Sequence, residues 1–366
     1  MSARLRLWWV AVNVVIPVAF VAFLVWVVVS RWDDISPVFN HPIRILVAIA
    51  ALILIGFAAT AWEFQLLYRA QGLRISLWES WMVFSTGQAG NLLPAQLGTI
   101  YRFRYMKAVH ALSYTRNGSN AGANLVISVA SAAIVGIIGI VALGVTTGRL
   151  SWVMLAIFAA MAAGAGLAMT VPLPRARFLR GTAQRFWVGF HEGWEELRRQ
   201  PRTALAVLGI DVGKYVFTAL RFQLAFGLVG VEESYWFFVA LAPVAGVAGI
   251  LAFTPGGLGL REGFLTLAAV ALGTTAVDGL LGATVDRGVL LLCVVGMGLL
   301  GYSWTWPRLR RASASADGDS APDPDGPTAG EPSATDQAAD APAGGVVAAT
   351  SEPTTADNDA ARTSSP

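Results

Sequence analysis

The sequence predicts an all-α, polytopic membrane helix bundle, and three observations support this prediction. Apolar residues make up 55% of the 366 residues and charged residues only 13%, about half the share of charge found in soluble domains. Several nearly uncharged stretches are long enough to cross a bilayer as helices. Basic residues gather beside these stretches, as they do on the cytoplasmic side of membrane proteins. Such a chain cannot cover a water-facing surface, but it can cover one that faces lipid.

The first half is expected to contain three crossings and one interrupted segment. The crossings are predicted at residues 7–30, 44–68 and 120–144, because a helix of about 20 residues spans a hydrocarbon core of about 30 Å. The first stretch is too long for the apolar core of a signal peptide. Residues 80–101 are also uncharged, but glycines and Pro94 break that stretch. It therefore favours a broken helix.

The second half repeats this organisation. Crossings are predicted at residues 151–171, 203–229 and 288–306. Residues 235–260 are uncharged but contain proline and glycine residues that interrupt a helix, and a short apolar stretch follows at 264–272. This region again favours a broken helical hairpin rather than one straight crossing.

Arginine positions assign the loops to sides of the membrane. Basic residues precede the first span, lie between Arg69 and Arg116, recur between Arg175 and Arg202, and follow the last span at Arg308. We therefore place both termini in the cytoplasm of a plasma-membrane protein. The assignment requires both broken segments to return to the side they entered from. We predict six full crossings plus two re-entrant hairpins, with eight or more crossings as the alternative.

The chain divides into a membrane domain and a tail of opposite charge. Residues 1–311 carry 25 basic and 13 acidic residues, a net charge of +12, whereas residues 312–366 carry 10 acidic residues and one arginine, a net of −9. The tail has no aromatic residue and cannot bury a core, so we predict disorder; it would be regulatory or merely solubilising. The basic residues form no soluble patch, so no nucleic-acid partner is predicted.

Residues 175–202 are predicted to form an amphipathic helix rather than a span. Phe186, Phe190, Trp194 and Leu197 fall on one helical face, and three glutamates and an arginine fall on the other. This pattern is typical of a helix lying on the cytoplasmic leaflet. A plain surface helix that joins the two halves is equally compatible with the pattern.

Two segments share the pattern P-x-x-L-G and indicate an internal repeat. They are Pro94-Ala-Gln-Leu-Gly98 and Pro255-Gly-Gly-Leu-Gly259. Each half, residues 7–145 and 151–306, then contains two spans, a broken hairpin and a further span. Three crossings per half invert the second copy, and in transporters with such repeats the broken helices form the substrate site near the midplane. Two unrelated proline kinks are the alternative interpretation.

Charged residues inside one predicted span point to a polar site. Asp211, Lys214 and Arg221 fall within an arc of about 80° on a helix that turns 100° per residue. Charges at such depth normally face a bundle interior or a cavity. We expect Lys214 and Arg221 to receive an anionic headgroup, with Asp211 pairing Lys214, because guanidinium donors match phosphate oxygens. A structural ion pair is the alternative. Arg261 and Glu262 beside the second hairpin are further candidates.

The sequence predicts neither a metal nor an organic cofactor. Cys293 is the only cysteine, and the three histidines lie far apart without ligand spacing. A G-x-G-x-x-G nucleotide-binding loop starting at Gly257 would need glycine at position 262, where the chain has Glu262. No Walker lysine is present either.

The two hairpin motifs resemble those of the lysylphosphatidylglycerol synthase transmembrane family, whose members are also described as flippase-like. The matching patterns are Asn91-x-x-Pro94-x-x-x-Gly98-x-x-x-Arg102 and Pro255-Gly256-Gly257-x-Gly259-x-Arg261-Glu262. The resemblance covers about residues 4–306 and implies a protein that moves lipids with charged or glycosylated headgroups between leaflets. Relatives that synthesise aminoacylated lipids carry a separate soluble transferase domain. This chain has only the tail there, so we expect a transporter rather than an enzyme.

The leading hypothesis is a flippase for a phospholipid or a polyprenyl-phosphate-linked lipid. Its expected substrate-binding residues are Asn91, Pro94, Gly98, Arg102, Asp211, Lys214, Arg221, Pro255, Gly256, Gly257, Gly259, Arg261 and Glu262. The basic members would neutralise a phosphate, and Glu262 or Asp211 would couple transport to protons. The alternatives are a membrane enzyme acting on a lipid-linked phosphate or glycan and an accessory subunit of such an enzyme. A homo-oligomer or a lipid-biosynthesis enzyme is the expected protein partner.

Overall fold

The computed structural model describes residues 43–93, 97–170, 198–251 and 254–318, together with a few positions between 184 and 195. Every regular element in these ranges is helical, which confirms the all-α fold. The predicted span at 7–30, Pro94 and most of the predicted amphipathic helix lie outside the described residues.

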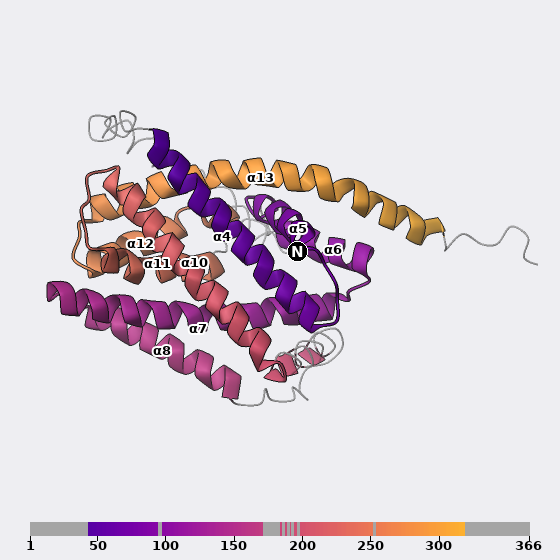
Figure 1. Cartoon of the computed structure of the whole chain (residues 1–366), viewed down its shortest axis with the longest axis horizontal. Helices are drawn as coiled ribbons and strands as arrows, with labels where there is room; N and C mark the ends of the chain where they lie inside the picture. Colours follow the sequence, from indigo (N-terminus) through magenta and orange to yellow (C-terminus); the bar gives the residue numbers. More distant parts are fainter. Residues whose placement is uncertain are drawn as a thin grey trace, which may run out of the picture. The chain divides into compact units, whose positions relative to one another are not determined.

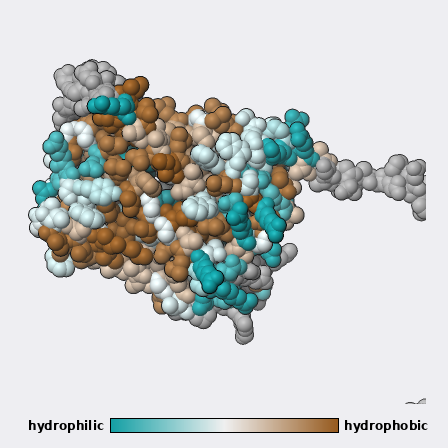
Figure 2. Space-filling view, viewed as in Figure 1, coloured by the Kyte–Doolittle hydropathy of each residue, from teal (hydrophilic) through white to brown (hydrophobic). Residues whose placement is uncertain are grey.

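Five helices of the described part are long and apolar enough to cross a membrane. They are α4 (Ile43–Ala70), α7 (Tyr114–Thr147), α8 (Trp152–Thr170), α10 (Pro201–Gly227) and α13 (Ala276–Gly318). They coincide with five of the six predicted crossings. Figure 2 shows an apolar band between two more polar ends, as expected for a surface that faces lipid. The protein is therefore a multi-pass membrane protein.

Two pairs of shorter helices occupy the positions of the predicted broken segments. The first pair is α5 (Leu77–Gly90) and α6 (Leu97–His110). The second is α11 (Tyr235–Leu251) and α12 (Leu260–Ala271), joined through the 3₁₀ turn η3 (Pro255–Gly257). At 1.5 Å per residue these helices measure only about 18–26 Å, less than the ~30 Å of a bilayer core. Both uncharged stretches are therefore broken hairpins and not straight crossings.

The helices pack in an exchanged pattern between the two halves. α4 packs against α10, while α5 of the first hairpin packs against α13 and α11 of the second hairpin packs against α7 (Figure 1). The first helix of each hairpin thus packs against the membrane-crossing helix that follows the other hairpin in the sequence. This exchange is the packing that the predicted inverted repeat would give. α8 packs mainly against α7, and its predicted counterpart at residues 7–30 lies outside the described residues.

Close backbone packing builds the first hairpin. A Cβ added to Gly98 would lie 1.7 Å from the carbonyl oxygen of Gly87, and one added to Gly90 would lie 2.6 Å from the Cα of Gly98. Only glycine permits this approach between α5 and α6. At its other end, the Ser76 side chain accepts a hydrogen bond from the backbone N–H of Glu79 and caps α5.

The last helix extends further than the sequence indicates. α13 continues through Gly318, so residues 312–318, which we assigned to the disordered tail, are helical. The reason is local, because Ala312-Ser-Ala-Ser-Ala contains no helix breaker and alanine is the best helix former. The rest of the tail lies outside the described residues.

Candidate functional site

The breaks of the two hairpins lie directly against each other. The backbone N–H of Gly256 in the second break donates a hydrogen bond of 2.8 Å to the carbonyl oxygen of Asn91 in the first. The side chain of Asn91 turns the other way, and its Oδ1 accepts a 3.0 Å hydrogen bond from the backbone N–H of Thr99 near the start of α6. Asn91 therefore orders its own hairpin through its side chain and contacts the other hairpin through its backbone.

Glycines give the second break its shape. Gly256, Gly257 and Gly259 all adopt positive φ angles, of 59°, 69° and 82°, which cost residues with a Cβ about 1–2 kcal/mol. The backbone N–H of Gly259 donates to Oε2 of Glu262 at 2.9 Å, which satisfies one of the free donors at the start of α12. The carbonyl oxygen of Gly256 accepts a hydrogen bond from Arg287 of α13. The P-G-G-L-G motif thus presents backbone groups to charged side chains.

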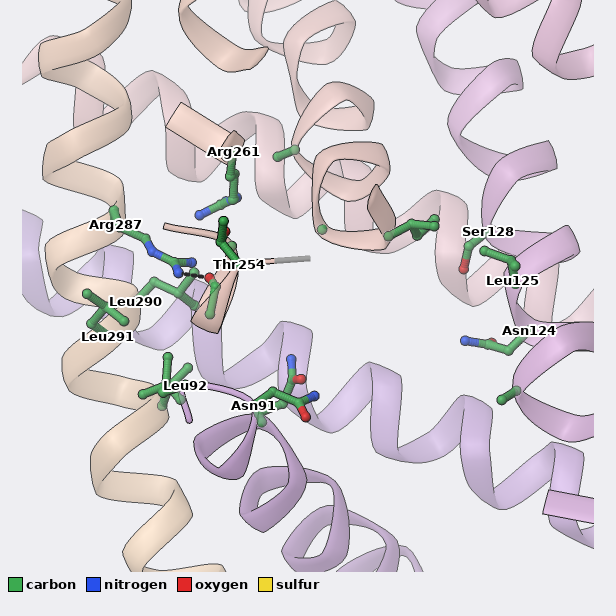
Figure 3. Close-up of a pocket in the computed structure, with 18 residues that line it drawn as sticks. Asn91, Leu92, Asn124, Leu125, Ser128, Thr254, Arg261, Arg287, Leu290 and Leu291 are labelled. Atoms are coloured by element: carbon green, nitrogen blue, oxygen red, sulfur yellow. Dashed lines mark hydrogen bonds between the residues drawn. The ribbon is translucent and has the colours of Figure 1, made fainter. Parts of the chain in front are cut away.

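A cavity of about 570 Å³ opens beside the two breaks. Its floor is formed by the ends of α5 and α11 and by the second break, and its sides are formed by α7 and α13. Arg287, Leu290 and Leu291 of α13 lie across the cavity from Asn124 and Ser128 of α7 (Figure 3). The volume falls within the range of about 300–1,000 Å³ typical of small-molecule sites. The cavity combines apolar walls with polar groups, both at the breaks and on α7.

A cluster of five buried charged residues lies beside this cavity and borders it through Arg261 and Arg287; here we call it the arginine cluster. Its members are Arg221, Arg261, Glu262, Asp286 and Arg287, all at most 9% exposed. Arg221 Nε lies 2.6 Å from Asp286 Oδ1 and Arg261 Nη2 lies 3.2 Å from Oδ2, while Arg287 Nε lies 3.4 Å from Glu262 Oε1. Three guanidinium groups face two carboxylates, so the cluster carries a net charge of +1 when all five groups are ionised.

Sequence reasoning missed two members of this cluster. Asp286 and Arg287 stand just before the predicted span at 288–306 and are not among the predicted site residues. In the structure α13 begins at Ala276, which places both residues inside the helix. The signal was present, because Thr275-x-x-Asp278 is a helix-start pattern. Thr275 Oγ1 indeed accepts a 3.1 Å hydrogen bond from the backbone N–H of Asp278.

A second group of charged side chains, two buried carboxylates and a partly buried lysine, lies between α4 and α10; here we call it the acidic trio. It consists of Glu63 from α4 with Asp211 and Lys214 from α10. Lys214 Nζ lies 2.7 Å from Glu63 Oε2 and 2.6 Å from Asp211 Oδ1. The predicted pairing of Asp211 with Lys214 is thus confirmed. Glu63 was missed, although a lone carboxylate in an apolar span is itself a signal.

Asp211 and Lys214 line a second cavity of about 280 Å³ between α4 and α10. This cavity shares four wall residues with the larger one, namely Gln88, Ser128, Ala245 and Arg261. The two cavities therefore lie back to back across the centre of the bundle, with Arg261 bordering both. Arg221 of the arginine cluster also borders the smaller cavity.

The structure separates residues that the sequence grouped around one phosphate. Arg102 lies over the ring of Phe64, 4.4 Å from its centroid, and borders neither of the two cavities. Lys214 is occupied by two carboxylates. Arg221 and Arg261, by contrast, share one counter-ion, Asp286. Pairings between residues so distant in the sequence depend on how the two halves pack, and hydropathy does not encode that packing.

This architecture defines a class of multi-pass membrane proteins in which two broken hairpins meet beside a charged cavity. The chain matches the family model for the Lysylphosphatidylglycerol synthase TM region over residues 14–298. It therefore belongs to this family, which confirms the resemblance of the hairpin motifs. A search of curated proteins finds no match to the chain.

Proposed function

We propose that the protein is a transporter that moves a phosphate-bearing membrane lipid between leaflets. The observation that carries this proposal is the arginine cluster with its net positive charge at the end of the larger cavity. Family membership adds support, because the family's transmembrane region belongs to proteins of charged-lipid metabolism. Phospholipids and polyprenyl-phosphate-linked lipids both fit, because each has a phosphate next to a long apolar chain.

The phosphate would bind between Arg261 and Arg287. Nη1 of Arg261 is buried and has no hydrogen-bond partner among the described residues, so one guanidinium donor is available to a ligand. A monoanionic phosphodiester would neutralise the +1 charge of the cluster. Asn124 and Ser128 across the cavity offer polar contacts to the rest of the headgroup (Figure 3).

The acyl chains would leave the cavity past Leu125 of α7 and Ile250 of α11. Leu125 of α7 and Ile250 of α11 line the cavity and are also 41% and 39% exposed, so the rim is apolar and reaches the surface. A lipid can then place its headgroup on the arginines while its chains remain in the bilayer. The crossing would occur in the plasma membrane, with both termini cytoplasmic, because arginines gather at one end of the spans.

The partners and positions of Glu262 and Asp211 favour a transport role over catalysis. Glu262 accepts a backbone hydrogen bond and faces Arg287, and Asp211 is paired with Lys214. Neither carboxylate lines the larger cavity, where the phosphate would bind, so neither is placed to act on the lipid as a general base. Association with a second copy or with a lipid-biosynthesis enzyme stays a prediction.

Reconstituted liposomes provide the test. Fluorescent phosphatidylglycerol should cross faster in the presence of the protein, as measured with a membrane-impermeant quencher. Arg261→Gln and Arg287→Gln should each slow translocation at subsaturating lipid by about 10- to 100-fold, the loss expected for one charge-assisted hydrogen bond. Arg149→Gln is the matched control, because Arg149 is exposed and pairs with Glu233 in a neighbouring loop. Equal rates for all four proteins would overturn the site, and conversion of a lipid-linked phosphate by protein in detergent would favour the enzyme instead.

A further inference from the structure

The acidic trio carries an unbalanced charge. Two carboxylates face a single ammonium group, so the trio has a net charge of −1 when Glu63, Asp211 and Lys214 are all ionised. Glu63 is completely buried and Asp211 is 3% exposed. Burying an uncompensated charge is strongly unfavourable unless another charge or a proton neutralises it.

The trio also has an open position for a proton. Oδ2 of Asp211 and Oε1 of Glu63 are buried without a hydrogen-bond partner among the described residues. Asp211 borders the smaller cavity, so its free oxygen lies on a route by which water can deliver a proton. A proton on either carboxylate would bring the trio to neutrality and supply the missing donor.

The arginine cluster is the nearest source of compensating charge. Arg221 and Arg261 border the same cavity as Asp211 and Lys214. The +1 of the arginine cluster thus balances the −1 of the acidic trio as long as the arginines have no external anion. An anion bound to the arginines removes this balance, because it neutralises the positive side only.

We propose that binding of a monoanionic phosphodiester at the arginine cluster drives uptake of one proton by the Glu63–Asp211 pair. This inference rests on the proposed function of the arginine cluster. The proton comes from bulk water through the smaller cavity, attaches to Oδ2 of Asp211 and is shared with Glu63; no other bond changes. Anion and proton then occupy the protein together, and the internal charge stays at zero throughout.

The surroundings contain few other groups that could take the proton. α10 presents Lys214, Tyr215 and Arg221 to the smaller cavity, and α12 presents Arg261. α5 and α7 contribute the uncharged side chains of Gln88 and Ser128, and the lining residues of α11 are alanine and glycine. Glu63 of α4 lies behind this lining and contacts Lys214. Asp211 is therefore the carboxylate that the lining of this cavity offers to a proton, and Glu63 shares it across the common contact with Lys214.

Proton uptake can be measured directly on the full-length protein in detergent. The protein is titrated with monomeric short-chain phosphatidylglycerol in weakly buffered solution containing a pH-indicator dye, while binding is followed by calorimetry. We expect wild type to take up about one proton per bound lipid, and lipid affinity to rise about tenfold for each unit of falling pH, because linkage is reciprocal. A parallel titration with dimethyl phosphate tests the headgroup charge without acyl chains. Uptake with either ligand supports the proposal.

Variants locate the proton. Glu63→Gln and Asp211→Asn keep the side-chain shape but remove one negative charge, so lipid should bind without proton uptake and with little pH dependence. Glu233→Gln, which alters a partly exposed loop carboxylate outside both charge groups, should behave as wild type. Binding by wild type without proton uptake, or uptake that persists in both variants, would overturn this inference and leave the proposed function standing. Absence of lipid binding by wild type would overturn both. The two outcomes that concern wild type alone do not depend on whether a variant folds.

Discussion

The two hairpins occupy equivalent places in the repeat, yet different interactions hold them. In the first, the backbone of Gly98 lies against that of Gly87, with no room for a side chain. In the second, glycines at positive φ form the turn, and the helix that follows contributes Arg261 and Glu262 to buried ion pairs. The two hairpins thus share a fold but differ in the buried charges that they contain.

The first hairpin therefore mainly supports the bundle, whereas the second brings charged side chains to the cavities. Arg102 follows the first motif as Arg261 follows the second, but Arg102 stacks on an aromatic ring whereas Arg261 borders both cavities. An inverted repeat gives both hairpins access to the centre of the bundle. The first hairpin contributes mainly backbone there, through Asn91, and the second contributes charge. Equivalent positions in the repeat would predict the same role for Arg102 and Arg261, but the two side chains have different surroundings in the structure.

The largest effect is expected from filling the contact inside the first hairpin. Gly98→Ala would place a methyl group 1.7 Å from a backbone oxygen, and the backbone cannot move aside as a side chain can. We expect a loss of at least about 3 kcal/mol in unfolding free energy, the upper end of overpacking effects. Thermal unfolding and size-exclusion chromatography in detergent measure it. Gly209→Ala, where an added methyl meets nothing within 4 Å, is the control, and equal stability of the two variants would contradict the close packing.

The second hairpin should be most sensitive to the loss of its shared counter-ion. Asp286→Asn leaves Arg221 and Arg261 buried without a negative partner. Removing one partner of a buried ion pair typically costs about 3–5 kcal/mol. Denaturant unfolding of the variant checks this value against Glu233→Gln, whose exposed pair should contribute less than about 1 kcal/mol. If both variants lose the same small amount, the arginine cluster does not hold the second hairpin.

A smaller effect is expected at the turn of the second hairpin. Gly256→Ala forces an alanine to φ 59° and brings its methyl group within 2.8 Å of Cδ2 of Leu92. Leu92 can rotate, so we expect only the conformational cost of about 1–2 kcal/mol, with a larger loss of lipid translocation because Arg287 binds this backbone. Gly263→Ala, in open space on α12, is the matched control. A translocation rate that falls no further than stability would show that the turn is only structural.

The sequence predicted the crossings and both breaks because long uncharged stretches and clusters of glycine and proline are local signals. It also placed Asp211, Lys214 and Arg221 on one face, since helical periodicity is local too. It did not predict that Arg221 pairs with Asp286 and Lys214 with Glu63, partners 65 and 151 residues away. Those pairings follow from the packing of α10 against α4 and α13. The substrate-binding roles themselves stay predictions.

The smallest effect concerns the open end of the first hairpin, outside the five crossing helices. Oε1 of Glu79 in α5 accepts a 2.8 Å hydrogen bond from the hydroxyl of Tyr105 in α6 and lies 2.8 Å from Nε2 of His110. Burial raises the pKa of Glu79, but these hydrogen bonds, together with the nearby charges of His110 and Arg308, hold the pKa below its ordinary value of 4.5.

A lowered pKa in the folded protein fixes the sign of the pH dependence. The carboxylate stabilises the hairpin at every pH above about 4.5, and this contribution disappears as the pH falls through the lower folded-state pKa. We expect Glu79→Gln to have a slightly lower melting temperature than wild type at neutral pH and to converge with it in acid. Melting curves in detergent from neutral pH downwards measure the difference between the two proteins. A difference that stays constant with pH would mean that this contact depends on shape rather than on the charge of Glu79.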